Sequence, residues 1–157
     1  TQIVRKYVDP DGPNLDCVLD IESAPQRLAD FVKGLAPPQY FFDHFGGRDA
    51  LGDVREVGRH HVSILDDHDM VWRSHKMRFA CGNHSVDVYA QNAHAVGVQL
   101  TTPGIPCIYY GTEQCFSGNQ DAHDPNHEPF DCSGCVPYAD RYVRESMFGG
   151  PFGAFGT

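Results

Sequence analysis

Residues 61–69, HVSILDDHD, decide the fold, because a strand-like run changes there within one residue to three acids and a histidine. Short, nearly continuous apolar runs are typical of parallel strands that are covered on both faces. Residues 61–65 therefore predict a strand, and residues 66–69 follow its carboxyl end. In parallel α/β folds, active sites form beyond that end of the strands. We expect the chemistry of this protein at residues 66–69, with a solvated turn or a metal site as the alternatives.

A strand and two helices are predicted before this stretch. Residues 14–21 predict a short strand, whose apolar residues are Leu15, Cys17, Val18, Leu19 and Ile21. Ser23 follows as a predicted helix N-cap, with Gln26 three residues later as in a capping box. Apolar residues then recur at helical spacing as far as Leu35, near which a glycine and two prolines end the pattern. A second, shorter helix is predicted over residues 39–45.

The alternation of helix and strand continues after the acidic stretch. Residues 86–100 carry apolar and small residues at helical spacing, and residues 105–110 predict a third strand, which Glu113 follows. The order strand, helix, strand, helix, strand predicts an α/β fold with a parallel sheet. From Cys115 onward glycine, proline, asparagine, aspartate and histidine dominate, so we expect a long irregular loop with a short helix over residues 140–147.

Length and charge restrict the classes of function. The chain has 157 residues and a formal net charge of −9. This charge argues against binding to nucleic acids or anionic membranes, since both need basic patches. No apolar run approaches the roughly 18 residues that span a bilayer, and no signal peptide is recognisable at the start. Because neither Thr1 nor Thr157 resembles a natural terminus, we expect a fragment of a longer chain.

The six cysteines are too sparse for a disulfide scaffold in a chain of this length. Cys17, Cys81 and Cys107 lie among apolar residues, where we expect buried free thiols. This pattern does not distinguish an oxidising from a reducing compartment, so the localisation stays open.

A second candidate site lies in the C-terminal loop. His123, His127, Cys132 and Cys135 have the spacing His-x3-His-x4-Cys-x2-Cys, and all four residue types can bind zinc. The gap between the two pairs is short for a zinc module. Solvated histidines and a disulfide, between Cys132 and Cys135 or from Cys115 to one of them, are the alternatives. We expect no cofactor in this chain.

Two motifs resemble glycoside hydrolase family 13, the α-amylase family. Residues 62–69, VSILDDHD, resemble its fourth conserved region, in which an apolar strand is followed by x-x-His-Asp. Residues 103–114, PGIPCIYYGTEQ, resemble its eighth barrel strand, with the pattern Gly-Ile-Pro-x-Ile-Tyr-Tyr-Gly-x-Glu. One helix-bearing segment separates the motifs, as in that family. The resemblance covers about residues 15–111, and residues 140–155 are similar to a segment that follows the barrel in some bacterial members.

The resemblance implies a fold that this chain holds only in part. The family has a (β/α)8 barrel, which takes about 250 residues. The resemblance therefore implies a partial TIM barrel over residues 1–114, with about strands six to eight and the helices between them. Residues 115–157 would be the loop after strand eight. The family's nucleophilic aspartate and acid/base glutamate follow strands four and five, so the missing N-terminal part of the barrel would carry them.

Two site residues carry over from the resemblance. Asp69 matches the carboxylate that stabilises the positively charged transition state, and His68 matches the histidine that donates a hydrogen bond to a sugar hydroxyl. The parent protein would be a retaining glycoside hydrolase that acts on an α-glucan or α-glucoside. The chain alone is expected to be inactive, and calcium occurs in some complete members. Glu113 is expected to shape the barrel mouth, and Trp72 to stack on a sugar or pack on the rim.

Two other classes of function stay open. The first is a non-catalytic binding protein that keeps the family's barrel, although retention of both His68 and Asp69 favours an enzyme. The second is a small interaction domain that is organised by zinc at the C-terminal loop.

Overall fold

The computed structural model describes residues 7–8, 15–47, 51–69, 78–80, 87–116, 143–144 and 147, and residues 71–72 and 75–76 by their backbone. These residues belong to two compact units, and each is described by itself. Unit 1 comprises residues 1–64 and 97–107, and unit 2 comprises residues 65–96 and 108–157. No helix among the described residues is long and apolar enough to cross a membrane.

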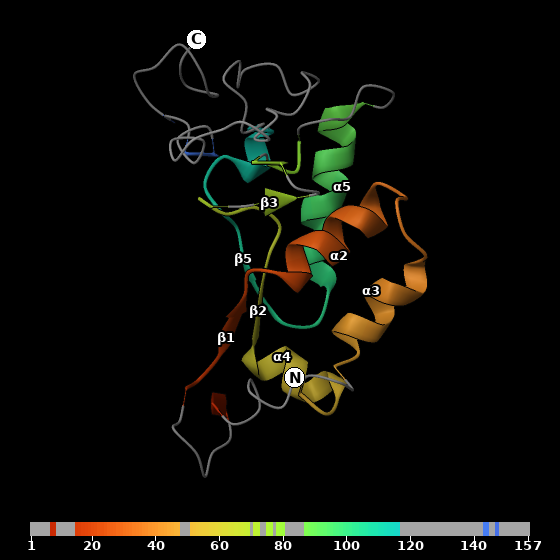
Figure 1. Cartoon of the computed structure of the whole chain (residues 1–157), viewed down its shortest axis with the longest axis vertical. Helices are drawn as coiled ribbons and strands as arrows, with labels where there is room; N and C mark the ends of the chain where they lie inside the picture. The colour runs from red at the N-terminus through yellow and green to blue at the C-terminus, as the bar shows by residue number, and fades with distance from the viewer. Residues whose placement is uncertain are drawn as a thin grey trace. The chain divides into compact units, whose positions relative to one another are not determined.

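Unit 1 contains a parallel sheet of three strands, which lie side by side in Figure 1. Its strands are β1 (Val18–Asp20), β2 (His61–Ile64) and β5 (Ile105–Cys107), and β2 lies in the middle. Leu19 pairs with Val62, and Val62 pairs with Ile105. The three parallel strands predicted from the sequence are confirmed, although each is shorter than its apolar run.

The helices between the strands follow the predicted order. They are α2 (Ser23–Val32), α3 (Pro38–Phe45) and α5 (Val88–Thr101), the last of which contributes residues to both units. A further helix, α4 (Val54–His60), was not predicted. Its signal was present, because Asp53 accepts hydrogen bonds from the N–H groups of Arg55 (2.8 Å) and Glu56 (3.0 Å). An aspartate three residues before a glutamate is a recognised helix start.

The prediction that Ser23 caps α2 was wrong. Ser23 is the first helical residue, and Glu22 stands at the N-cap position without a capping side chain. The cap comes from Asp20 instead, whose Oδ1 accepts the N–H of Ser23 at 2.7 Å and of Glu22 at 3.3 Å. Asp20 can do this because it is the last residue of β1, so its carboxylate lies beside the turn into the helix.

Unit 1 has its apolar core between helices and sheet. The buried face of α2 includes Leu28 and Ala29, and the Phe31 ring stacks on Phe41 of α3 with 4.4 Å between centroids. Helix α5 is tied to two strands, because the Gln99 amide donates to the carbonyls of Ser63 (2.9 Å) and Cys107 (3.1 Å). The sheet is therefore anchored to its helices by apolar contact and by a buried amide.

Unit 2 holds the segments that follow β2 and β5. Strands β3 (Val71–Trp72) and β4 (His75–Lys76) pair antiparallel, and the 3-10 helix η1 (Thr112–Gln114) follows a turn at Gly111. None of these three elements was predicted. Gly111 has a φ of 79°, and a Cβ there would meet the Phe116 ring at 2.3 Å. The helix predicted over 140–147 lies largely outside the described residues.

Candidate functional site

The acidic stretch after β2 begins with a buried residue, Asp66, which we call the anchor, and ends with two exposed residues. Asp66 is 1% exposed, Asp67 is half-buried, and His68 and Asp69 are exposed. The four residues predicted together as one site therefore have two different roles. The exposed pair is accessible to a ligand from solvent, whereas the Asp66 side chain makes its contacts in the interior.

Asp66 joins the ends of the two predicted motifs within unit 2. Its Oδ1 accepts the Phe79 N–H at 2.6 Å, and its Oδ2 accepts the Thr112 hydroxyl at 3.1 Å. The Arg78 Nε lies 3.4 Å from the same Oδ2. Burial raises the pKa of the Asp66 carboxyl, while the Arg78 guanidinium and these hydrogen bonds oppose that shift. The anchor thus connects residues 66 and 112, which follow neighbouring strands.

Arg78 was not singled out from the sequence. It is fully buried, and one of its terminal nitrogens donates to the carbonyl of Tyr110 at 2.5 Å. The rings of Tyr109, Tyr110 and Phe116 lie 4.8, 5.5 and 5.3 Å from its guanidinium carbon. The only sequence signal was an arginine beside an aromatic residue shortly after the acidic stretch, which is too common to be informative.

Asp69 and His68 lie in the exposed turn beyond β2. The Asp69 N–H donates to Asp67 Oδ1 at 2.6 Å, and the His68 carbonyl accepts from Arg144 Nε at 3.0 Å. These contacts hold the backbone of the turn, and both side chains are accessible at its surface. Glu113 is also exposed, and the Gln114 amide donates to it at 2.9 Å. The roles given to Asp69, His68 and Glu113 stay predictions.

Several predicted features lie outside the described residues. These are the side chain of Trp72, the thiol of Cys81, and the candidate zinc pattern of His123, His127, Cys132 and Cys135.

The expectation of buried thiols was wrong at two positions. Cys17 and Cys107 are free and exposed. Cys115 is the buried free thiol among the described residues, and burial raises its pKa to about 11. At neutral pH this thiol is protonated and unreactive.

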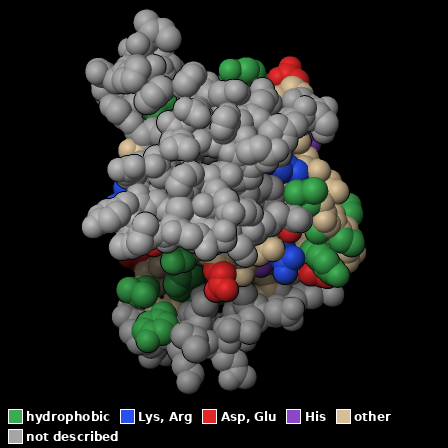
Figure 2. Space-filling view, turned by 45° about the horizontal axis from the view of Figure 1, so that its top comes forward, with side chains coloured by type: hydrophobic (Ala, Val, Ile, Leu, Met, Phe, Trp, Pro, Cys, Tyr) green, Lys and Arg blue, Asp and Glu red, His purple; other side chains and the backbone are tan. Residues whose placement is uncertain are grey.

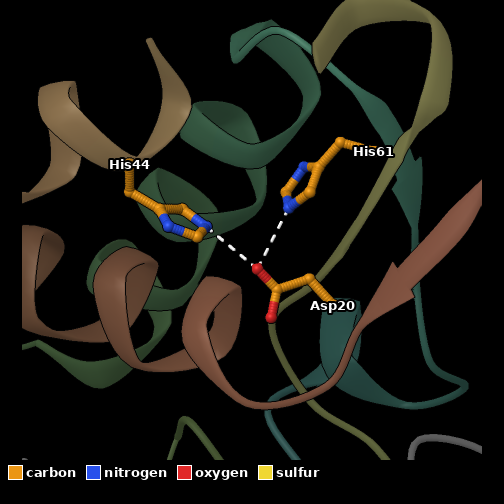
Figure 3. Close-up of side chains that lie close together, drawn as sticks. All are labelled: Asp20, His44 and His61. Carbon is orange, nitrogen blue, oxygen red and sulfur yellow. Dashed lines mark hydrogen bonds and ion pairs between the residues drawn. The ribbon is translucent and has the colours of Figure 1, made fainter. Parts of the chain in front are cut away.

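A second polar cluster lies in unit 1. Asp20 at the end of β1, His44 in α3 and His61 at the start of β2 converge, and both imidazoles point to one carboxylate oxygen (Figure 3). Asp20 Oδ2 is 2.9 Å from His44 Nε2 and 3.1 Å from His61 Nε2. Burial opposes ionisation of Asp20, but the two imidazoles and the Ser23 N–H hold the pKa of its carboxyl well below the usual value.

This cluster borders a cleft of about 570 Å³ in the same unit. Its walls include Arg27 and Tyr40, which stack with 5.4 Å from the guanidinium carbon to the ring centroid. No sequence pattern indicated this cluster, since its members are up to 41 residues apart and form no motif.

The described chain is thus an α/β protein with a parallel sheet and polar clusters at the ends of its strands. No protein-family model matches it. Its sequence is 42% identical to a cyclomaltodextrin glucanotransferase of Bacillus sp. (strain 1-1) over 60 residues, which are 38% of this chain and 7% of that enzyme. It is 32% identical over 87 residues to the cyclomaltodextrin glucanotransferase of Paenibacillus macerans, covering 46% of this chain and 12% of that enzyme. The chain therefore matches about a tenth of the length of these relatives.

Proposed function

We propose that this chain is part of an α-amylase-type retaining glycoside hydrolase that acts on α-glucosidic bonds. In this proposal, β1, β2 and β5 are about strands six to eight of a (β/α)8 barrel. The observation that carries it is the junction of the two motifs: residues 62–69 and 103–114 supply adjacent parallel strands, and Asp66 accepts a hydrogen bond from Thr112 just beyond them. The partial similarity to two cyclomaltodextrin glucanotransferases supports the same origin.

The proposed chemistry assigns one role to each exposed residue of the turn. Asp69 stays ionised and stabilises the oxocarbenium-like transition state, while His68 donates a hydrogen bond to a sugar hydroxyl. A hydrogen bond that strengthens in the transition state raises the rate and not only the affinity. The nucleophile and the acid/base residue come from the barrel strands that precede this chain in the proposed parent protein.

The similarity to glucanotransferases bears on the type of reaction. A retaining enzyme forms a covalent glycosyl intermediate, which either water or another sugar hydroxyl can release. Since both relatives are named as transferases, we propose transfer between α-glucan chains as an activity of the parent protein beside hydrolysis.

The test compares residues of the same turn in the parent protein. Asp69→Asn is expected to lower kcat on starch or a nitrophenyl α-glucoside by at least about a hundredfold, as loss of a transition-state stabilising group does in other enzymes. Asp67→Asn is the control, because Asp67 accepts the Asp69 N–H within the turn and an asparagine amide oxygen can still accept it. Equal activities of the two variants would contradict the role of Asp69. The 157-residue chain alone is expected to show no turnover above a buffer blank.

A further inference from the structure

Asp20, His44 and His61 have a donor set that the proposed glycosidase chemistry does not use. One ligand atom from each residue lies within 4.8 Å of the others. The three residues come from three elements that are separate in the sequence, so their convergence is a product of the fold (Figure 3). A carboxylate oxygen with two imidazole nitrogens is a set that zinc and other divalent transition metals bind in proteins.

Hydrogen bonding accounts for only part of this arrangement, since His61 Nε2 is hydrogen-bonded to Asp20 Oδ2 at 3.1 Å. His44 Nε2 is buried and 2.9 Å from Asp20 Oδ2, yet it makes no hydrogen bond of acceptable geometry among the described residues. The 2.9 Å contact is therefore an ion-pair contact with the Asp20 carboxylate and lacks the alignment of a directed hydrogen bond. A buried nitrogen that points at a carboxylate without a directed hydrogen bond indicates room for another partner.

The carboxylate is already oriented by groups outside the cluster. Asp20 Oδ1 accepts the N–H groups at the start of α2, as described above, which leaves Oδ2 directed at the two imidazoles. Metal-binding carboxylates are commonly held in this way by outer hydrogen bonds.

We propose that Asp20, His44 and His61 form a binding site for one divalent transition-metal ion of the zinc type. Tetrahedral zinc with bonds of about 2.0–2.2 Å places its ligand atoms roughly 3.3 Å apart. The two nitrogen–oxygen separations of 2.9 and 3.1 Å need to widen by only a few tenths of an ångström to reach this value. The bordering cleft leaves space for water as the remaining ligand. The bound ion would join α3 to β1 and β2.

The experiment measures zinc and cobalt binding to the full 157-residue chain without a histidine tag. Cys132→Ser and Cys135→Ser are introduced first, so that the C-terminal pattern cannot supply thiolate ligands. We expect one ion per chain by metal analysis, and a cobalt spectrum without a thiolate charge-transfer band. Calorimetric titration then compares His44→Gln and His61→Gln with His94→Gln, whose histidine is exposed on α5.

We expect His44→Gln and His61→Gln to weaken zinc binding at least about tenfold, because loss of a residue that only supports a metal ligand already costs about that much. His94→Gln is expected to have no effect on zinc binding. Circular dichroism identifies which variants keep the native helix signal, and Asp20→Asn is a third variant that retains a capping oxygen. Weakened binding in the folded variants supports the site. Absence of saturable binding, or equal affinity of any folded cluster variant and His94→Gln, would overturn it.

Discussion

At the scale of single residues, the carboxylate of Asp66 is hydrogen-bonded to Thr112, which is 46 residues away in the sequence and follows the neighbouring strand. It does so at 1% exposure, with the fully buried Arg78 as its counter-ion. A buried ion pair adds little net stability against an apolar pair of the same shape, but it becomes costly when one partner is lost. Asp66 therefore makes the exposed turn at His68 and Asp69 depend on an intact interior.

Asp66→Asn tests this dependence, because it removes the charge and keeps the size of the side chain. We expect the free energy of unfolding to fall by about 3–5 kcal/mol, since removing one charge of a buried ion pair is strongly destabilising. Urea unfolding followed by circular dichroism measures the change. The neighbouring Asp67→Asn is half-buried and serves as control, with an expected change within about 0.5 kcal/mol. Similar losses in both variants would show that Asp66 has no special role.

At the scale of elements, Gln99 connects helix α5 to two strands of the sheet, as Asp66 connects the two turns that follow those strands. Its amide donates to a carbonyl of β2 and to one of β5 while the residue is 1% exposed. A single side chain thereby fixes how a helix sits on two strands. Backbone carbonyls that lose such a donor in the interior keep their desolvation cost.

Gln99→Met is expected to lower the free energy of unfolding by about 1–3 kcal/mol, because it fills the same volume and leaves both carbonyls without this donor. Thermal or urea unfolding provides the measurement. Gln26→Met on α2 is the matched control, since Gln26 is exposed and should tolerate the change. An unchanged midpoint in Gln99→Met would mean that the two hydrogen bonds contribute no stability.

At the scale of the whole molecule, one face of the sheet carries exposed apolar side chains. Leu19, Val62 and Ile105 are neighbours across the three strands, and Leu19 and Ile105 are 52% and 40% exposed. Ile21, just after β1, is 62% exposed. Hydrophobic side chains of the described residues are visible as green surface in Figure 2. Apolar faces of this kind mark surfaces that another segment covers, which in our proposal is the rest of the barrel.

The isolated chain is therefore expected to bind a hydrophobic dye and to associate as its concentration rises. Leu19→Lys should weaken both effects clearly, because it places a charge on the exposed face of the sheet. Leu35→Lys is the control, since Leu35 is 46% exposed but lies outside the sheet. Dye fluorescence and light scattering provide the readings. A monomeric chain that binds no dye and unfolds cooperatively would contradict the partial-barrel proposal.

The order of strands and helices was predictable because each element leaves a local pattern. The apolar run at 61–65 and the small-residue periodicity at 86–100 correspond to β2 and α5. Helix α4 was not predicted because its sequence signal was a single capping pair. The hairpin of β3 and β4 was not predicted because two-residue strands have no periodicity to detect. Ser23 was misassigned because capping depends on which nearby oxygen reaches the N–H groups, and Asp20 is better placed.

The amino-acid sequence by itself determined the α/β order of elements, the acidic stretch beyond the central strand and the resemblance to the α-amylase family, since all three depend on short-range patterns. Only the tertiary structure decided that Asp66 is an anchor paired with Arg78, and that Asp20, His44 and His61 meet around one oxygen. The physical reason is that burial and side-chain contact are set by how distant strand ends and helices pack, and a linear pattern does not record those distances.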